Sequence, residues 1–290
     1  MVNRYLAILV FSLIWMIGFC QNNEVKKSKE FPKAIPTVQG VNNVKLNTDI
    51  MVDYTKDQVY VTRDGKDLHL QILTPKKSGL LPCIVFIQGS AWMKQDLYMG
   101  IPRLSKFASR GYIIASVEYR HTGEAPFPAQ VQDAKTAIRF IRKNAKKLNV
   151  DPDNIYVWGD SSGGHTALFA GITRGNKELD TEEYIEYSDE VNGIIDFYGP
   201  TDIGAMQEDP SIFNHSKADS PEGLLIGKLD VTKNMDKAAK ASPINYINKE
   251  ENIPPILIAH GDMDRTVPFR QSDCEEMYDI IEAFLKKYRK

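Results

Sequence analysis

The chain has 290 residues, of which 42% are hydrophobic and 26% charged, so it contains enough apolar material for a sizeable core. Its 36 basic and 38 acidic residues give a formal net charge of -2, and neither sign gathers in a block. This balance argues against nucleic acid and against an anionic membrane surface as the partner.

The N-terminal segment has the composition of an export signal. Met1 to Arg4 carry one positive charge, and Leu6 to Phe19 form an uncharged apolar run that is short for a permanent membrane span, the rival interpretation. Cys20 follows in "IGFC", which resembles a bacterial lipobox with a lipid anchor on Cys20, although Phe19 is larger than the small residue usual there. Cleavage without lipidation is the alternative. We expect a signal peptide over residues 1–20 and an exported protein: a periplasmic, outer-membrane or cell-surface lipoprotein, or a secreted one.

The remaining chain divides into a tether and one domain. Residues 21–45 mix Lys, Asn, Pro and Val without periodicity and are expected to be a tether, so that a single domain occupies residues 46–290. Cys83 lies in an apolar run and Cys274 in a predicted helix. The cysteines form no disulfide framework and no metal spacing, and no phosphate-binding loop is present, so we expect no metal and no other cofactor.

Strand and helix patterns alternate along this domain. The first two predicted strands are joined at Asp64-Gly65, a hairpin signal. Continuous apolar runs predict strands buried on both faces. Predicted strands lie at 58–75 (the hairpin), 83–89, 112–120, 154–160, 191–200 and 254–262. Predicted helices lie at 102–110, 130–148, 163–173 and 267–290. This alternation predicts an α/β fold with a mostly parallel sheet covered on both faces.

One of these strands runs directly into a helix through a G-x-S-x-G motif, Gly159-Asp160-Ser161-Ser162-Gly163. Such a motif places its central serine on a strained turn, where small flanking residues let the chains approach, and the next backbone N–H faces a developing oxyanion. The register therefore predicts Ser161 as the nucleophile and Ser162 as an oxyanion donor. A Gly-rich turn with only a structural role is the alternative.

With this motif in its strand–helix context, the chain resembles the α/β-hydrolase family from about residue 45 onward. The branch it resembles is that of secreted bacterial esterases and lipases with carbohydrate-ester activity, distantly similar to prolyl oligopeptidases. The stretch "FIQGSAW", residues 86–92, is similar to the H-G-G-G-W loop of such esterases, which implies backbone oxyanion donors at Ser90 and Ala91. Gln88 and Ser90 replace the usual His and Gly, but main-chain donors do not require those side chains.

Two further stretches carry the resemblance. In "HGDMDRTVP", residues 260–268, the family pattern H-G-x-x-D-x-x-V-P assigns the triad acid to Asp264, which would orient an imidazole, with Asp262 as the alternative. The segment from Glu118 onward resembles a strand–loop–helix of the family. Its Arg120 and Asp133 are expected to form a buried ion pair or cap, and its Phe127-Pro128 a rigid helix start.

The general base that the family places after the acid is absent from this sequence. In this fold the triad order is Ser, Asp, His, but no histidine follows Asp264. The two helical patterns of residues 271–290 meet at Asp279-Ile280 without the strand and loop that carry the histidine in the family. We therefore expect an internal deletion, a missing last strand, and a fused or bent C-terminal helix that covers part of the exposed edge. The alternative is that one of the five histidines present, His69, His121, His165, His215 or His260, serves as the base, which requires it to lie within hydrogen-bond reach of Ser161.

Three functional hypotheses follow. The first is a serine hydrolase of small carboxylic esters, such as acyl groups on carbohydrates, acting through an acyl-enzyme on Ser161. The second is a catalytically impaired relative that binds a ligand or partner in the old pocket. The third is a peptidase of the prolyl oligopeptidase type, against which the chain offers no propeller-sized region to gate peptides. The expected partner is a small-molecule ester substrate, and none of the three hypotheses involves nucleic acid.

Overall fold

The computed structural model describes residues 51–208, 211–247, 253–261, 264–267 and 275–290. The predicted signal peptide, the anchor at Cys20, the tether and Cys274 lie outside this part of the chain. Within it, no helix has the length and apolar character needed to cross a membrane. Among the same residues, no group of three or more His, Cys, Asp or Glu side chains is arranged to hold a metal ion.

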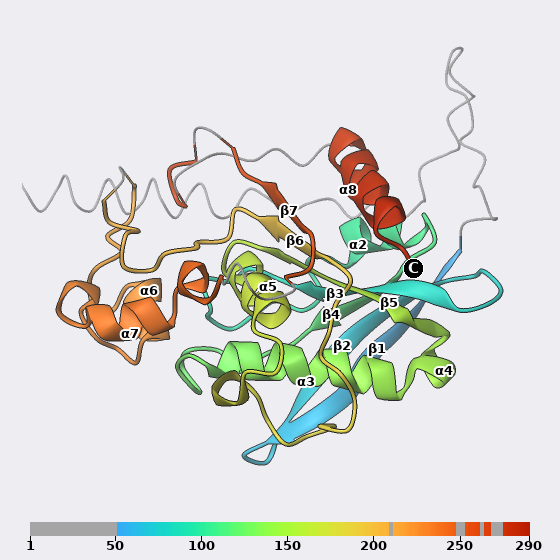
Figure 1. The fold of residues 1–290 in the computed structure, drawn as a ribbon, viewed down its shortest axis with the longest axis horizontal. Helices are drawn as coiled ribbons and strands as arrows, with labels where there is room; N and C mark the ends of the chain where they lie inside the picture. Colours follow the sequence, from blue (N-terminus) through green and yellow to red (C-terminus); the bar gives the residue numbers. More distant parts are fainter. Residues whose placement is uncertain (1–50, 209–210, 248–252, 262–263, 268–274) are drawn as a thin grey trace, which may run out of the picture. The chain divides into compact units, whose positions relative to one another are not determined.

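A seven-stranded sheet forms the centre of the domain (Figure 1). Its strands are β1 (Val52–Arg63), β2 (Lys66–Pro75), β3 (Leu81–Ile87), β4 (Ile113–Val117), β5 (Val150–Asp160), β6 (Ile194–Phe197) and β7 (Ile256–Ala259). They lie in the order β1-β2-β4-β3-β5-β6-β7. The pairs β1–β2 and β2–β4 are antiparallel and all the others are parallel, which confirms the predicted α/β class and the hairpin at Asp64-Gly65.

The helices follow the predicted alternation. They are α2 (Ile101–Ala108), α3 (Ala129–Lys143), α4 (Ala145–Leu148), α5 (Ser162–Ile172), α6 (Pro221–Leu225), α7 (Met235–Lys240) and α8 (Glu275–Lys287), with short 3₁₀ turns η1 (Lys177–Leu179), η2 (Val231–Lys233) and η3 (Pro243–Tyr246). The single helix predicted over 130–148 is divided at Asn144. The Asn144 side chain donates to the Phe140 carbonyl at 2.8 Å, and such local bonding by asparagine competes with a continuous helix.

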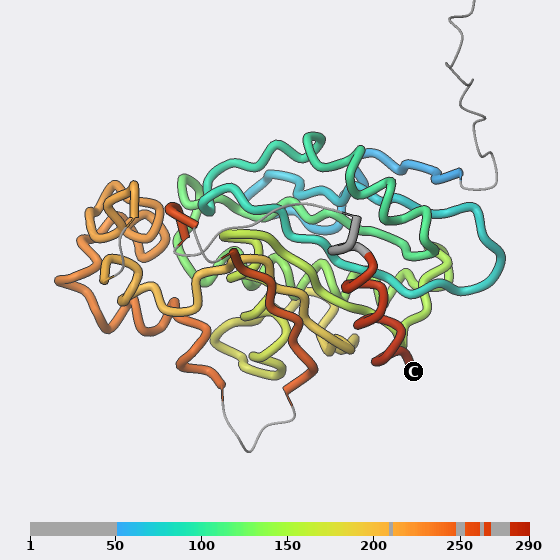
Figure 2. The backbone as a smooth tube through the Cα atoms, turned by 90° about the horizontal axis from the view of Figure 1, so that it is seen from above, coloured from blue at the N-terminus to red at the C-terminus, as the bar shows by residue number. Residues whose placement is uncertain are grey.

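Alternate residues of β3 separate two apolar layers. Cys83, Val85 and Ile87 face the layer that α3 and α5 cover, with Ile138 and Leu168 among its buried members. Ile84 and Phe86 face the layer covered by α2 and α8. Figure 1 shows these helices on opposite sides of the sheet, and Figure 2 shows the same backbone from above. Every residue of β3 is buried, as the continuous apolar run predicted for a strand between two helical layers.

The predicted ion pair next to this core is present. Asp133 on α3 is fully buried, and both of its carboxylate oxygens accept from the Arg120 guanidinium at 2.9 Å. Arg63 on β1 reaches the same carboxylate at 3.3 Å. The pair therefore joins β1, the loop after β4 and α3.

The C-terminal helix α8 runs without interruption through the predicted junction at Asp279-Ile280. Its Ile281 and Leu285 are buried against the face of the sheet, in the layer that also contains Leu257 and Ala259 of β7. Of the predictions for this region, the fused helix is therefore confirmed. In the described part of the chain no strand follows β7, and residues 268–274, where a loop would start, lie outside that part.

Candidate active site

Ser161 lies on the turn between β5 and α5, at the carboxyl edge of the sheet. Its backbone has φ 51° and ψ -126°, a combination that L-residues rarely adopt. The turn is held from both sides, because Ser161 N–H donates to the Phe197 carbonyl at 2.8 Å and the Ser161 carbonyl accepts from His165 N–H at 3.1 Å. The local backbone is that of a nucleophile elbow, with the conformational strain that such an elbow requires.

The two glycines of the motif allow this turn because other backbone segments approach them too closely for a side chain to fit. A Cβ atom on Gly159 would overlap the Gly163 carbonyl, and one on Gly163 would overlap the Ile87 carbonyl at the end of β3. Both obstacles are backbone atoms, which have little room to move. The motif therefore serves to pack α5 against two strand ends while Ser161 is lifted out of the sheet.

The loop after β3 is attached to the elbow by the side chains on either side of Ser161. Gly89 N–H donates to Asp160 Oδ1 at 2.7 Å, and Ser90 N–H donates to Ser162 Oγ at 2.9 Å. The sequence pattern gave no role to these two side chains. The sequence feature that could have indicated such a role is that both variable positions of the G-x-S-x-G motif hold polar residues.

These contacts decide which backbone amides are open for an oxyanion. Ser90 N–H is already bonded to Ser162 Oγ, so it becomes an oxyanion donor only if that hydroxyl turns away. The N–H groups of Ala91 and Ser162 donate to no acceptor within the described residues. Ala91 has φ 54°, a turned conformation that fits the predicted loop. The assignment of Ser162 and Ala91 as donors stays a prediction, and the geometry favours them over Ser90.

Buried polar side chains hold the same loop from below. The Tyr119 hydroxyl lies 2.9 Å from Ser90 Oγ, and burial raises the pKa of Tyr119 to about 12, so this phenol stays neutral. Gln95 donates to the carbonyls of Gln88 and Val117 and accepts from Tyr119 N–H at 3.0 Å. The loop is thus fixed to the ends of β3 and β4, and its amides need little reorganisation to meet a developing charge.

Asp264 lies beyond the end of β7, on the same edge of the sheet as Ser161. Its Oδ1 accepts from the backbone N–H groups of Thr266 and Val267, at 2.7 and 3.1 Å. The carboxylate thus stabilises its own turn, and its predicted role in orienting an imidazole stays a prediction. The alternative, Asp262, lies outside the described residues.

None of the five histidines donates to or accepts from Ser161 Oγ in the part of the chain that the structure describes. His165 is fully enclosed in the core. Its Nδ1 accepts from Trp92 Nε1 at 3.2 Å, so that Nε2 carries the proton and donates to the Ala241 carbonyl at 2.8 Å. Burial lowers the pKa of His165 to about 4, which keeps this ring neutral and structural at neutral pH.

The other four histidines are engaged elsewhere. His215 is buried between Glu222 Oε1 at 2.9 Å and Ser211 Oγ at 2.8 Å, and Ser211 in turn donates to the Arg265 carbonyl next to Asp264. His260 Nε2 lies 3.1 Å from the Val267 carbonyl. The remaining two bond near their own strands, His69 to Glu118 and His121 to Gly123 N–H. Among the described contacts, the hydroxyl of Ser161 therefore has no general base.

A buried acid that sequence reasoning missed lies beneath the elbow helix. Asp196 on β6 is 1% exposed and accepts from Gly199 N–H at 2.9 Å. Its Oδ1 is so near Gly164 of α5 that a Cβ there would overlap it. Burial raises the pKa of Asp196 to about 7, so its charge changes near neutral pH directly under the nucleophile helix.

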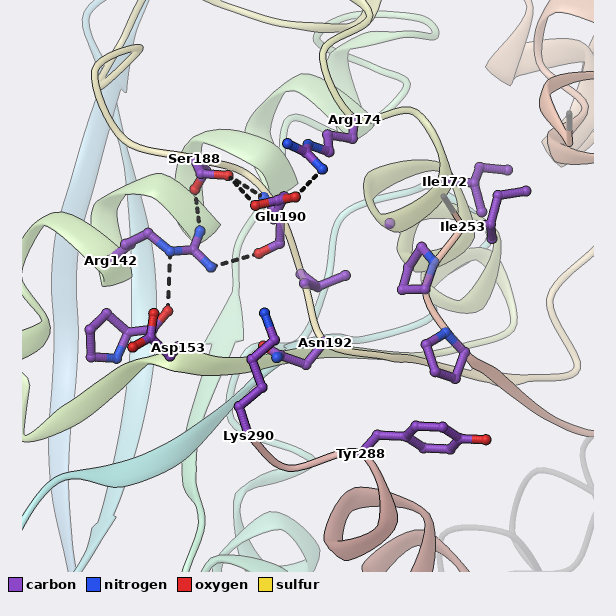
Figure 3. Close-up of a pocket in the computed structure, with 15 residues that line it drawn as sticks. Arg142, Asp153, Ile172, Arg174, Ser188, Glu190, Asn192, Ile253, Tyr288 and Lys290 are labelled. Carbon is purple, nitrogen blue, oxygen red and sulfur yellow. Dashed lines mark hydrogen bonds and ion pairs between the residues drawn. The ribbon is translucent and has the colours of Figure 1, made fainter. Parts of the chain in front are cut away.

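A cavity of about 700 Å³ lies at the opposite, amino-terminal edge of the sheet (Figure 3). Its lining comes from the starts of β5, β6 and β7, with Asp153, Asn192 and Pro255 as examples. Arg142 donates there to the carbonyls of Ser188 and Glu190. Since Ser161 stands at the carboxyl ends of the same strands, this cavity is not part of the candidate active site.

A mostly parallel sheet, a serine elbow after β5 and an amide-rich loop after β3 together define an α/β-hydrolase. The family model described as BD-FAE matches residues 70–277. The chain therefore belongs to the BD-FAE family of α/β-hydrolases.

Curated relatives support this assignment. Esterase LipC of Mycobacterium tuberculosis is 29% identical over 193 residues, which are 66% of this chain and 46% of LipC. Isoprenylcysteine alpha-carbonyl methylesterase ICME of Arabidopsis thaliana is 25% identical over 229 residues, 76% of this chain and 49% of ICME. The chain thus spans about half the length of the curated relatives it matches.

Solved structures agree. A truncated carbohydrate esterase from gut microbiota has a TM-score of 0.66 and 31% identity, and the match covers 83% of this chain and 86% of that one. Esterase 2 of Thermogutta terrifontis, solved with propionate bound, has a TM-score of 0.57 and 28% identity, over 83% of this chain and 80% of that one. The predicted fold and its resemblance to esterases are confirmed by these comparisons.

Proposed function

We propose that this chain hydrolyses small carboxylic esters through an acyl-enzyme on Ser161. The strained elbow at Ser161, with an open amide at Ser162 of the elbow and another at Ala91 of the anchored loop, is the observation that carries the proposal. The hydroxyl attacks the ester carbonyl, the carbonyl oxygen takes the negative charge toward these amides, and the alcohol leaves with a proton. Water then releases the acid from Ser161.

The acyl group is proposed to be short and the alcohol to belong to a carbohydrate. The support comes from the relatives, because one matched structure is a carbohydrate esterase and another holds propionate. The named relatives are esterases, which favours ester over peptide bonds as the target.

The lack of a histidine in contact with Ser161 among the described residues sets the expected rate. Removal of one triad member from a serine hydrolase typically leaves only about 10³–10⁴-fold catalysis over water, supplied by the oxyanion hole and binding. We therefore propose slow turnover, with solvent water as the proton acceptor from the Ser161 hydroxyl.

The test uses the full chain with a fluorophosphonate probe and with short-chain nitrophenyl and sugar acetates. Labelling of Ser161 and turnover that disappears in Ser161→Ala are expected. Labelling and turnover equal to those of Ser161→Ala would reject the proposal in favour of an impaired relative that only binds ligands. Asp264→Asn is the second variant, because turnover lost there with the free energy of unfolding unchanged would assign this carboxylate a part in the reaction beyond the bonds within its own turn.

We also propose that the protein is exported and carries a lipid anchor on Cys20. The support is the apolar run of residues 6–19 followed by "IGFC". Mass spectrometry of the mature N-terminus distinguishes a diacylated Cys20 from a cleaved, unmodified chain and from an uncleaved one. Only the first outcome agrees with the anchor.

A further inference from the structure

A second cavity, of about 370 Å³, lies beside α7, and Ser161 is not among the residues that line it. We call it the α7 pocket. Four segments meet there: residues 126–128, η1, the two residues after α6, and the stretch from α7 to η3. Its volume falls within the range of about 300–1,000 Å³ that is usual for small-molecule sites.

The walls of the α7 pocket are aromatic and fixed in place. Phe127 and Tyr246 both line it, and both pack on the fully buried Phe169 of α5, with ring centroids 5.0 and 5.1 Å apart. The Tyr246 hydroxyl donates to the Lys240 carbonyl at 2.9 Å, which fixes the orientation of its ring. The floor is formed by the buried side chains of Leu179 and Ile226. The pocket is therefore preformed, and the larger part of its lining is apolar.

The rim of the pocket carries an excess of positive charge. Lys237 and Lys240, both exposed on α7, line the pocket together with one exposed carboxylate, Glu178 of η1. Within the described residues, neither lysine forms an ion pair. Two ammonium groups above an apolar floor complement a ligand that has an apolar body and one negative end.

We propose that the α7 pocket binds a small carboxylate with an apolar chain or ring, with the body on Leu179 and Ile226 and the carboxylate toward Lys237 and Lys240. A sugar is a poorer match, because the side chains of Leu179 and Ile226 offer its hydroxyls no hydrogen-bond partner. Carboxylates are also the class of product that ester hydrolysis releases. The binding does not depend on Ser161, so it stands or falls separately from the proposed function.

The binding test uses the full chain with isoleucine methyl groups labelled for NMR, and Ile226→Val assigns the reporter signal on the pocket floor. The ligands are hexanoate and phenylacetate. Their neutral amides, acetate and xylose are the comparison ligands. We expect the Ile226 signal to shift with the two apolar carboxylates. The amides should bind at least about threefold more weakly than the acids, because they lack the negative charge that the lysines attract.

The matched variants separate this pocket from any other acid site. Lys237→Gln combined with Lys240→Gln is expected to weaken hexanoate binding about threefold to tenfold and to lower its salt dependence. The control is Lys233→Gln, since Lys233 is an exposed lysine of the same segment that pairs with Asp230 instead. No shift at Ile226, equal binding of acids and amides, stronger binding of xylose, or unchanged affinity in the double variant would each overturn the proposal.

Discussion

The conformational strain at Ser161 makes a prediction about stability that does not require activity. Ser161 has φ 51° and ψ -126°, and a residue with a Cβ in such a sparsely populated region costs about 1–3 kcal/mol. Glycine has no Cβ and adopts this backbone without that cost. We therefore expect Ser161→Gly to be more stable than the wild-type chain, although it removes the hydroxyl.

The magnitude follows from two opposing terms. Relief of strain raises the free energy of unfolding by about 1–3 kcal/mol. The greater conformational freedom of glycine in the unfolded chain lowers it by about 0.5–1 kcal/mol. The net gain is about 1 kcal/mol in the free energy of unfolding, which corresponds to about 2–4 °C in Tm for a domain of this size.

The control is Ser161→Ala, which removes the same hydroxyl but keeps the Cβ and therefore the strain. Thermal and urea unfolding of the three proteins measure the difference. If Ser161→Gly is no more stable than Ser161→Ala, the elbow is not strained, and the argument that the fold holds Ser161 in a reactive geometry fails.

Three other predictions concern the groups around the elbow. Asp160→Ala should lower the free energy of unfolding by about 1–2 kcal/mol because Gly89 N–H loses its acceptor, whereas Asp160→Asn, which keeps an acceptor oxygen, should lose less; equal losses in urea unfolding would contradict the anchoring role. Burial raises the pKa of Asp196 to about 7, so the folded protein holds this proton more tightly than the unfolded chain does. The stability that Asp196 contributes is therefore fully present below about pH 4 and is lost as the pH rises through 7. Asp196→Asn should therefore gain stability relative to wild type over this range, by up to about 4 kcal/mol in pH-dependent unfolding curves, and a constant difference would be the opposing result. Added imidazole should raise Ser161-dependent ester turnover roughly tenfold by supplying the missing base; an equal rise in Ser161→Ala, measured at the same imidazole concentration, would show that the imidazole acts in solution.

The secondary structure of the chain was largely predictable because it depends on short-range periodicity. The buried strand at residues 81–87, the hairpin at Asp64-Gly65 and the elbow helix after Ser161 all lie where the pattern placed them. The break at Asn144 was missed, because a single side-chain bond to the Phe140 carbonyl competes with a helix that the periodicity favours.

The candidate site was predictable in part. The register alone selected Ser161 over Ser162, since only Ser161 stands at the centre of the motif. It gave no indication that the neighbours Asp160 and Ser162 bond consecutive amides of the loop after β3, because those partners lie about 70 residues away in the sequence.

The sequence by itself determined the class of fold and the candidate nucleophile, because both are a matter of residue order and local spacing. Only the tertiary structure decided that His165 and His215 are buried with their ring nitrogens already bonded, and which loop amides remain open. The physical reason is that the hydrogen-bond partners of these groups come from segments that are distant in the sequence and meet only in the folded chain. A motif specifies where a group stands in the chain, and packing between distant segments decides whether that group is still free to react.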